Sequence, residues 1–248
     1  MMPPRKITTL MLDCDNTLVL SEELAFEACA DLINEIIKNQ KLPIDKTYTG
    51  PILMSEFVGQ NFRGMLATLL ARCGKQLDPD KMESYVRREE DAVIAKLEEK
   101  LVACPGVDAV LPRLRDKGYK LGVVSSSALR RVKASIEKVG QAQYFGDDVY
   151  SAASSLPRPT SKPDPAVYLH ALEKMGVKAE NCVAVEDSKS GTLAAMRAGI
   201  KVVGYVGPYE EGQKEAMEKT LKEAGAAVVM RDWSEFEACL AKIEKGLL

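Results

Sequence analysis

The 248-residue chain lacks several features that mark particular classes of protein. It contains no apolar run of membrane-spanning length, and its first residues show no apolar core of a signal peptide. It also lacks a charge excess, since 34 Lys and Arg residues stand against 36 Asp and Glu residues. A nucleic-acid-binding protein usually needs a basic face. We therefore expect a cytoplasmic protein, monomeric or weakly dimeric, that binds neither nucleic acid nor a membrane.

The chain also lacks closely spaced cysteine pairs and has only one histidine. The cysteines are scattered without a C-x-x-C pair, so we expect reduced thiols that mostly pack in the interior; they are Cys14, Cys29, Cys73, Cys104, Cys182 and Cys239. The single histidine, His170, lies in an apolar helical segment, which favours a packing role over a catalytic one. Candidate catalytic groups must therefore be sought among other residues.

Apolar residues make up 46% of the chain, and their spacing changes along it. Residues 18–100 carry helical patterns only, whereas strand and helix patterns alternate from residue 105 onward, with glycine repeatedly marking helix ends. The expected strands are 7–12, 119–124, 149–152, 182–185, 200–206 and 226–230. The expected helices are 21–40, 54–72, 80–100, 107–117, 128–139, 165–175, 190–198, 209–224 and 233–245.

This alternation predicts an α/β fold with a doubly wound parallel sheet and an all-helical insertion after the first strand. We expect residues 1–17 and 101–248 to form the α/β core, and residues 18–100 to form the inserted domain. The polar, proline-rich segment 153–165 should be a loop over the carboxyl edge of the sheet. Ligands of such sheets bind beyond the carboxyl ends of the strands, so the residues that follow each strand are the candidate site.

Two pairs of acidic residues follow predicted strands. Asp13 and Asp15 come after the first strand, and Glu186 and Asp187 follow the strand expected at 182–185. Burying such charges is costly unless a cation or a reacting group compensates them. One acidic pair could simply form a turn or stabilise a helix dipole, but two pairs at one edge suit a hard metal ion beside a reactive carboxylate.

Two further segments could bind an anion at the same edge. Ser125, Ser126 and Ser127 precede a predicted helix, where hydroxyl and backbone N–H groups form an anion site, or where a serine simply caps the helix. Lys162 lies in the proline-rich loop, and alone it would be an ordinary solvated lysine. Together with the acids, these groups fit phosphoryl transfer, in which Mg²⁺ and lysine screen the charge of the phosphate.

With these residues in this order, the chain resembles members of the haloacid dehalogenase superfamily over essentially its whole length. The four motifs of that superfamily have counterparts in order: Asp13-x-Asp15-x-Thr17, Val123-Val124-Ser125, Ser161-Lys162-Pro163-Asp164-Pro165 and Val185-Glu186-Asp187-Ser188. The helical insertion resembles a C1-type cap. The strongest likeness is to the branch that contains β-phosphoglucomutase and small sugar-phosphate phosphatases.

The resemblance implies a role for each acid. Asp13 would be the nucleophile that forms an aspartyl-phosphate, and Asp15 would protonate the leaving oxygen and then activate water. Asp187 would bind Mg²⁺, helped by Glu186, the carboxylate of Asp13 and the backbone carbonyl of Asp15. A halide needs no proton, so the acid at Asp15 favours a phosphatase or phosphomutase over a dehalogenase.

The resemblance also implies which residues contact the substrate. Ser125, Ser126 and Lys162 would hold the transferring phosphoryl group. In the cap, the segment 59–63 resembles one in which an arginine, here Arg63, meets the distal anion or hydroxyls of a sugar phosphate. Glu22 would line the same pocket. A plain surface arginine and helix-dipole compensation are the alternatives for these two cap residues.

Departures from the pattern help to choose the reaction. Asn16 stands where glycine is frequent, and asparagine tolerates the left-handed conformation that the turn needs. Ala25 stands where the mutase branch has a histidine, and this difference argues against a mutase. We therefore expect a Mg²⁺-dependent phosphatase for a sugar or polyol phosphate, with a cap that opens and closes. A hexose-phosphate mutase and a catalytically silent phospho-ligand-binding protein are the alternatives.

Overall fold

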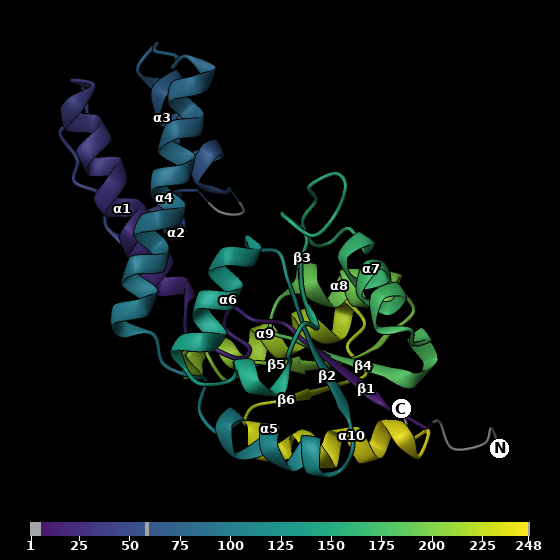
Figure 1. The fold of residues 1–248 in the computed structure, drawn as a ribbon. Coiled ribbons are helices and arrows are strands. Elements are labelled where there is room, and N and C mark those ends of the chain that lie inside the picture. Colours follow the sequence, from purple (N-terminus) through teal and green to yellow (C-terminus); the bar gives the residue numbers. More distant parts are fainter. Residues whose placement is uncertain (1–5, 58–59, 248) are drawn as a thin grey trace. The chain divides into compact units, whose positions relative to one another are not determined.

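The computed structural model describes residues 6–57 and 60–247 (Figure 1). Within these residues, one sheet is formed by β1 (Thr9–Leu12), β2 (Lys120–Ser125), β3 (Val149–Ser151), β4 (Cys182–Glu186), β5 (Lys201–Tyr205) and β6 (Val228–Met230). Its pairings are parallel, in the order β3-β2-β1-β4-β5-β6. β1 lies in the middle of the sheet. The chain then adds β2 and β3 on one side of β1, and β4, β5 and β6 on the other side. The predicted doubly wound α/β fold is confirmed.

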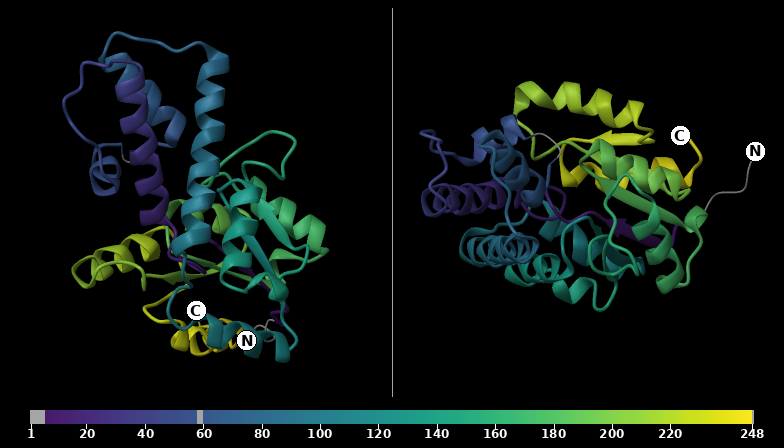
Figure 2. Two further views of the ribbon diagram at one scale, coloured as in Figure 1. Left: turned by 60° about the vertical axis from the view of Figure 1, so that its left-hand side comes forward. Right: turned by 90° about the horizontal axis from the view of Figure 1, so that it is seen from above.

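Helices cover both faces of this sheet. They are α5 (Val107–Asp116), α6 (Leu129–Lys138), α7 (Ala166–Met175), α8 (Lys189–Arg197), α9 (Glu211–Glu223) and α10 (Phe236–Glu244). Met11 and Val124 belong to an apolar cluster with side chains of α7 and α8. Leu10 and Leu12 point to the opposite face, because side chains alternate along a strand, and α5 and α10 lie side by side there (Figures 1 and 2). Each residue of β1 is therefore buried.

The chain divides into two compact units. The core unit contains residues up to 20 together with those from 102 onward, and the helical unit contains residues 21–101. The described part of the helical unit consists of α1 (Glu22–Asn39), α2 (Gly50–Glu56), α3 (Phe62–Arg72) and α4 (Pro79–Lys100). Within it, α1 packs along α4 and α2. That residues 18–100 act as a cap over a substrate remains a prediction.

One expected helix, 54–72, is wrong as a continuous element. The structure has α2 ending at Glu56 and α3 beginning at Phe62. The side chain of Asn61 accepts a hydrogen bond from the backbone N–H of Gly64 at 3.0 Å, so Asn61 starts a new helix as its N-cap. Gly59, the first residue of the expected cap segment, lies outside the described residues. The other predicted elements agree with the structure to within a few residues.

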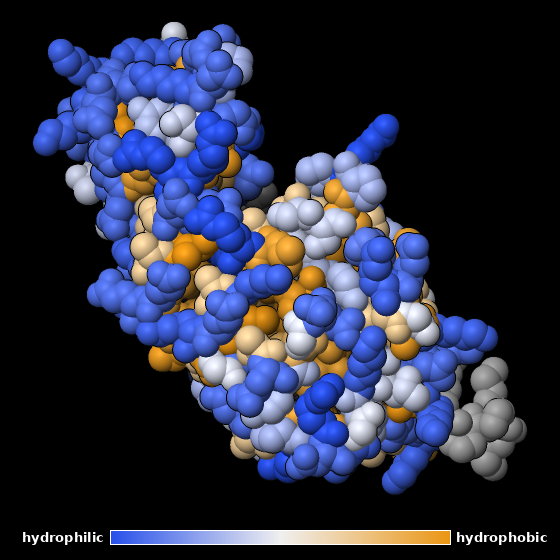
Figure 3. Space-filling model, viewed as in Figure 1, coloured by the Kyte–Doolittle hydropathy of each residue, from blue (hydrophilic) through white to orange (hydrophobic). Residues whose placement is uncertain are grey.

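The expected packing of the cysteines and of His170 is confirmed. The cysteines carry thiols, and every one of the six except Cys73 is buried. His170 packs edge-on against Tyr150, with ring centroids 5.8 Å apart. The face of the helical unit visible in Figure 3 carries mostly hydrophilic side chains. Of the helices that the structure describes, none is both long and apolar enough to cross a membrane.

Candidate active site

The carboxyl ends of β1 and β4 bring three predicted acids together. Leu12 pairs with Val185, so Asp13 and Glu186 follow at the same level of the sheet. Asp13, Glu186 and Asp187 are all buried, and one carboxylate oxygen from each lies within 4.8 Å of the others. A buried triad of like charges needs compensation, which a cation supplies.

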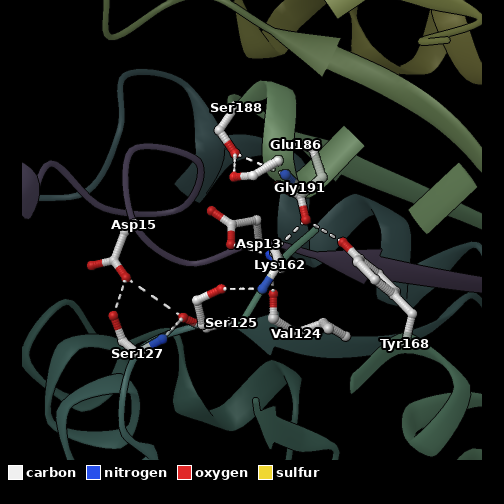
Figure 4. Close-up of polar contacts among 12 residues, drawn as sticks. Asp13, Asp15, Val124, Ser125, Ser127, Lys162, Tyr168, Glu186, Ser188 and Gly191 are labelled. Carbon is white, nitrogen blue, oxygen red and sulfur yellow. Dashed lines mark hydrogen bonds and ion pairs between the residues drawn. The ribbon is translucent and has the colours of Figure 1, made fainter. Parts of the chain in front are cut away.

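Lys162 supplies part of this compensation (Figure 4). Its ammonium nitrogen donates hydrogen bonds to Oδ1 of Asp13 at 2.6 Å, to Oε1 of Glu186 at 2.5 Å and to the carbonyl oxygen of Val124 at 2.8 Å. Burial alone would lower the pKa of Lys162, but the two carboxylates raise it above its usual value. The lysine therefore stays charged although it is only 8% exposed.

Glu186 is the most constrained acid of the cluster. Its Oε1 accepts hydrogen bonds from Lys162 and from the hydroxyl of Tyr168, whereas its Oε2 is buried without a hydrogen-bond partner in the part of the chain that the structure describes. Burial raises the pKa of Glu186 to about 7, against the opposing effect of Lys162. Oε2 lies so close to Gly191 that a Cβ atom there would overlap it. The glycine at the start of α8 is therefore required for this position of the carboxylate.

Asp15 lies in a turn after β1 and is held by residues of the β2–α6 segment. Arg131 donates from Nη2 to Oδ1 of Asp15 at 2.6 Å, and the Ser127 hydroxyl donates to Oδ2 at 2.7 Å. The Ser125 hydroxyl lies 3.5 Å from the same Oδ2. Asn16 has a φ of 57°, which confirms that asparagine adopts the left-handed conformation of the turn. These contacts fix the orientation of the Asp15 carboxylate.

The serine segment is not an ordinary helix cap. The residue before α6 is Ala128, whose side chain cannot cap the helix, and the N–H of Leu129 donates to the Ser154 hydroxyl at 3.3 Å. Instead, the Ser125 hydroxyl accepts a hydrogen bond from the N–H of Ser127 at 3.0 Å, and the Ser126 hydroxyl accepts one from the N–H of Lys162 at 3.1 Å. The serines therefore connect the end of β2 to the loop that carries the lysine. The Ser125 hydroxyl thus lies next to Asp15, and the Ser126 hydroxyl contacts the backbone of Lys162. That either serine binds phosphate remains a prediction.

Sequence reasoning missed several residues that contact the site. Arg131 contacts Asp15, Tyr168 contacts Glu186, and the hydroxyl of Tyr209 donates to Oδ2 of Asp187 at 3.2 Å. Arg131 and Tyr168 each follow a motif serine or lysine by six residues. This spacing alone does not show which way a helical side chain points, so it carried no clear signal.

The two remaining candidate residues belong to the helical unit. Arg63 on α3 pairs with Glu83 on α4, with 2.6 Å between Nη1 and Oε1, and its side chain is 45% exposed. Glu22 is the exposed first residue of α1. Their expected contacts with the substrate remain predictions.

A doubly wound α/β core that gathers buried acids and a buried lysine at one sheet edge is the framework of an enzyme. Comparison with protein families makes this specific. The family model described as haloacid dehalogenase-like hydrolase matches residues 7–199. The chain belongs to this family, and the resemblance stated from the motifs is confirmed.

Curated relatives indicate the type of hydrolase. The chain is 34% identical over 158 residues to the phosphorylated carbohydrates phosphatase of Thermotoga maritima, covering 61% of this chain and 66% of that protein. It is 28% identical over 219 residues to hexitol phosphatase B of Escherichia coli, covering 87% and 90%. A solved hydrolase of the same family from Deinococcus radiodurans, with bound phosphate and sodium, is 26% identical, with a TM-score of 0.68 and 98% of each chain covered. The expected enzyme class, a phosphatase of this family, is confirmed.

Proposed function

We propose that this phosphatase hydrolyses sugar or polyol phosphates in a Mg²⁺-dependent reaction, through an aspartyl-phosphate formed on Asp13. The observation that carries the proposal is the convergence of Asp13, Glu186 and Asp187, with Lys162 hydrogen-bonded to the first two. The substrate class is supported by the two relatives named above, whose names refer to phosphorylated carbohydrates and to hexitol phosphate.

The acidic cluster fits Mg²⁺ by its chemistry. Its donors are carboxylate oxygens, which hard divalent cations prefer, and they lie within 4.8 Å of one another. Oε2 of Glu186 is a buried acceptor to which none of the described residues donates, and a cation or its bound water would satisfy it. Asp13, Glu186 and Asp187 would hold the ion, with the backbone carbonyl of Asp15. When bound, Mg²⁺ would screen the negative charge of the phosphoryl group.

The chain's own residues then carry out two displacements at phosphorus. Lys162 engages Oδ1 of Asp13, so Oδ2 is the oxygen that attacks. The new bond joins Oδ2 to phosphorus as the bond to the ester oxygen breaks, and Asp15 gives that oxygen its proton. Asp15 then accepts a proton from the water that hydrolyses the aspartyl-phosphate. The contact with Arg131 fixes the orientation of the Asp15 carboxyl group for both proton transfers.

Several parts of the proposal concern features beyond the core site. Arg63 and Glu22 would select the substrate, and the helical unit would open and close about hinges near residues 17–21 and 101–106. A monomeric or weakly dimeric state and a cytoplasmic location stay predictions from the sequence.

The test is phosphate release from a panel of phosphorylated sugars, polyols and nucleotides, with and without Mg²⁺. We expect turnover of at least one sugar or polyol phosphate, its loss in EDTA, and a decrease of at least about a thousandfold in Asp13→Asn, which removes the nucleophile. The exposed Asp116 provides a matched control, and Asp116→Asn should retain activity.

Two other results would favour the alternatives. Conversion of a sugar 1-phosphate into its isomer without net release of phosphate would indicate a mutase. An absence of turnover across the whole panel, including a generic aryl phosphate, would indicate a phospho-ligand-binding protein without catalytic activity.

A further inference from the structure

Tyr168 is a side chain of the site for which the proposed reaction has no role. It lies on α7 and is completely buried, and its hydroxyl donates a hydrogen bond to Oε1 of Glu186. The ammonium nitrogen of Lys162 lies 5.4 Å from the centroid of its ring (Figure 4). One side chain therefore contacts both members of the buried ion pair.

The two contacts restrict the carboxylate of Glu186. A glutamate carboxylate rotates easily about its last side-chain bond, because that torsion is broad. Two donors on Oε1, one from Lys162 and one from Tyr168, fix the plane of the carboxylate and hence the position of Oε2. Tyrosine suits this task because its ring is rigid, whereas the ammonium group of lysine sits on a flexible stem.

The position that results is an unusual one for a carboxylate oxygen. Oε2 of Glu186 is buried and lies against Gly191, and it has no hydrogen-bond donor among residues 6–57 and 60–247. Leaving a charged acceptor in this state is unfavourable unless a ligand completes it. The contacts on Oε1 thus hold the other oxygen ready for a cation, at the cluster that Glu186 forms with Asp13 and Asp187.

We propose that Tyr168 is a positioning residue for the cation site, whose hydroxyl holds Glu186 in the orientation that binds Mg²⁺. The inference rests on the metal site of the proposed function and adds to it a residue outside the four sequence motifs. Tyr168 acts through Glu186 and needs no contact with the substrate.

A purely structural role is the competing explanation, and one substitution separates the two. Tyr168 belongs to an apolar cluster with Val167 and Ala171. Phenylalanine keeps the ring in that cluster and the ring contact with Lys162, so packing alone predicts no change in metal binding. Tyr168→Phe removes only the hydroxyl that contacts Glu186.

Tyr150 offers a matched control. It is also a buried tyrosine of the core unit, and its hydroxyl donates to Oδ1 of Asp148 at 2.8 Å. Asp148 is outside the acidic cluster of the site. Tyr150→Phe therefore removes an equivalent hydroxyl–carboxylate hydrogen bond that has no connection with the proposed cation site.

The experiment is calorimetric titration of Mg²⁺ alone into the metal-free, full-length protein, without substrate. We expect Tyr168→Phe to raise the dissociation constant about tenfold or more, as is usual when a residue that orients a metal ligand is lost. Tyr150→Phe should bind Mg²⁺ like the wild type. In phosphatase assays, the Mg²⁺ concentration for half-maximal activity should rise similarly in Tyr168→Phe, whereas kcat at saturating Mg²⁺ and KM should stay close to wild type.

The possible results are distinct. Equal Mg²⁺ affinity of wild type and Tyr168→Phe would overturn the inference, and so would a Tyr168→Phe protein that no Mg²⁺ concentration restores, because that indicates a structural defect. Wild-type protein that binds no Mg²⁺ would refute the metal site and the inference together. Weakened binding in Tyr168→Phe would support the inference even if the wild type hydrolysed none of the substrates, a result that would refute only the proposed reaction.

Discussion

Replacing Lys162 by methionine should show how far the buried charges depend on one ammonium group. Methionine has a similar length and volume but no charge, so Asp13 and Glu186 would remain as buried neighbours of the same sign. Breaking a buried ion pair by removing one partner destabilises a protein by about 3–5 kcal/mol. We expect the free energy of unfolding of the metal-free protein to decrease by about this amount at a pH near 8.

This loss of stability should become smaller as the pH falls. Burial raises the pKa of Glu186 from 4.5 to about 7 while Lys162 is present, and removal of the ammonium group would raise it further. A carboxyl group with a higher pKa in the folded than in the unfolded state binds its proton more readily when folded. The carboxyl group therefore destabilises the folded protein fully when the pH is above its pKa in the folded state. This destabilisation disappears as the pH decreases toward its pKa in the unfolded state. The deficit of Lys162→Met should accordingly be smaller at a pH near 5 than near 8.

Urea denaturation in EDTA, followed by tryptophan fluorescence, measures this effect. Trp233 is the only tryptophan and is buried in the core unit, where its Nε1 donates to the carbonyl oxygen of Thr17 at 3.1 Å. Lys120→Met is the control, because the Lys120 side chain is 43% exposed and its ion pair with Asp148 should contribute less than about 1 kcal/mol. A deficit in Lys162→Met as small as that of the control, or one that does not change with pH, would refute the reasoning.

Two further substitutions test other contacts of the site. Gly191→Ala places a Cβ atom on Oε2 of Glu186, so it should lower the free energy of unfolding by about 1–3 kcal/mol in melting experiments. It should also lower Mg²⁺-dependent activity in kinetic assays. Gly212→Ala is the control and should leave activity unchanged, because open space surrounds the added methyl group. Arg131→Met removes the guanidinium group that orients Asp15, so kcat should fall about tenfold to a hundredfold while the melting temperature stays within a few degrees, and an unchanged kcat would contradict this role.

The acids of the site could be predicted because their positions follow from a local property of the sequence. Asp13 and Glu186 come at or directly after the end of an apolar strand, and parallel strands bring such positions to one edge. Lys162 lies in an irregular loop, so its place beside Asp13 could be inferred only from the motif. The resemblance thus supplied what periodicity could not.

Other contacts could not be predicted because they depend on how a helix is rotated against the sheet. Arg131 and Tyr168 are helical residues, and small changes in the preceding loops would turn either side chain away from its carboxylate. The serine segment presented a similar problem, because the preference of serine for helix caps is real but Ala128 takes that position. The break between α2 and α3 was missed because apolar spacing continues through residues 54–72, whereas the Asn61 cap interrupts the helix.

The register of β1 has a consequence for the order in which the protein forms. Thr9 pairs with Lys120 on one side and with Cys182 on the other, so β1 cannot gain its first neighbour before β2 has been made, or its second before β4 has been made. Residues 21–101 make their contacts within one contiguous stretch and can assemble while synthesis continues. The charged centre is consequently completed only when β4 has been made, and a nascent chain that stops before β4 would carry Asp13 and Lys162 without Glu186 and Asp187.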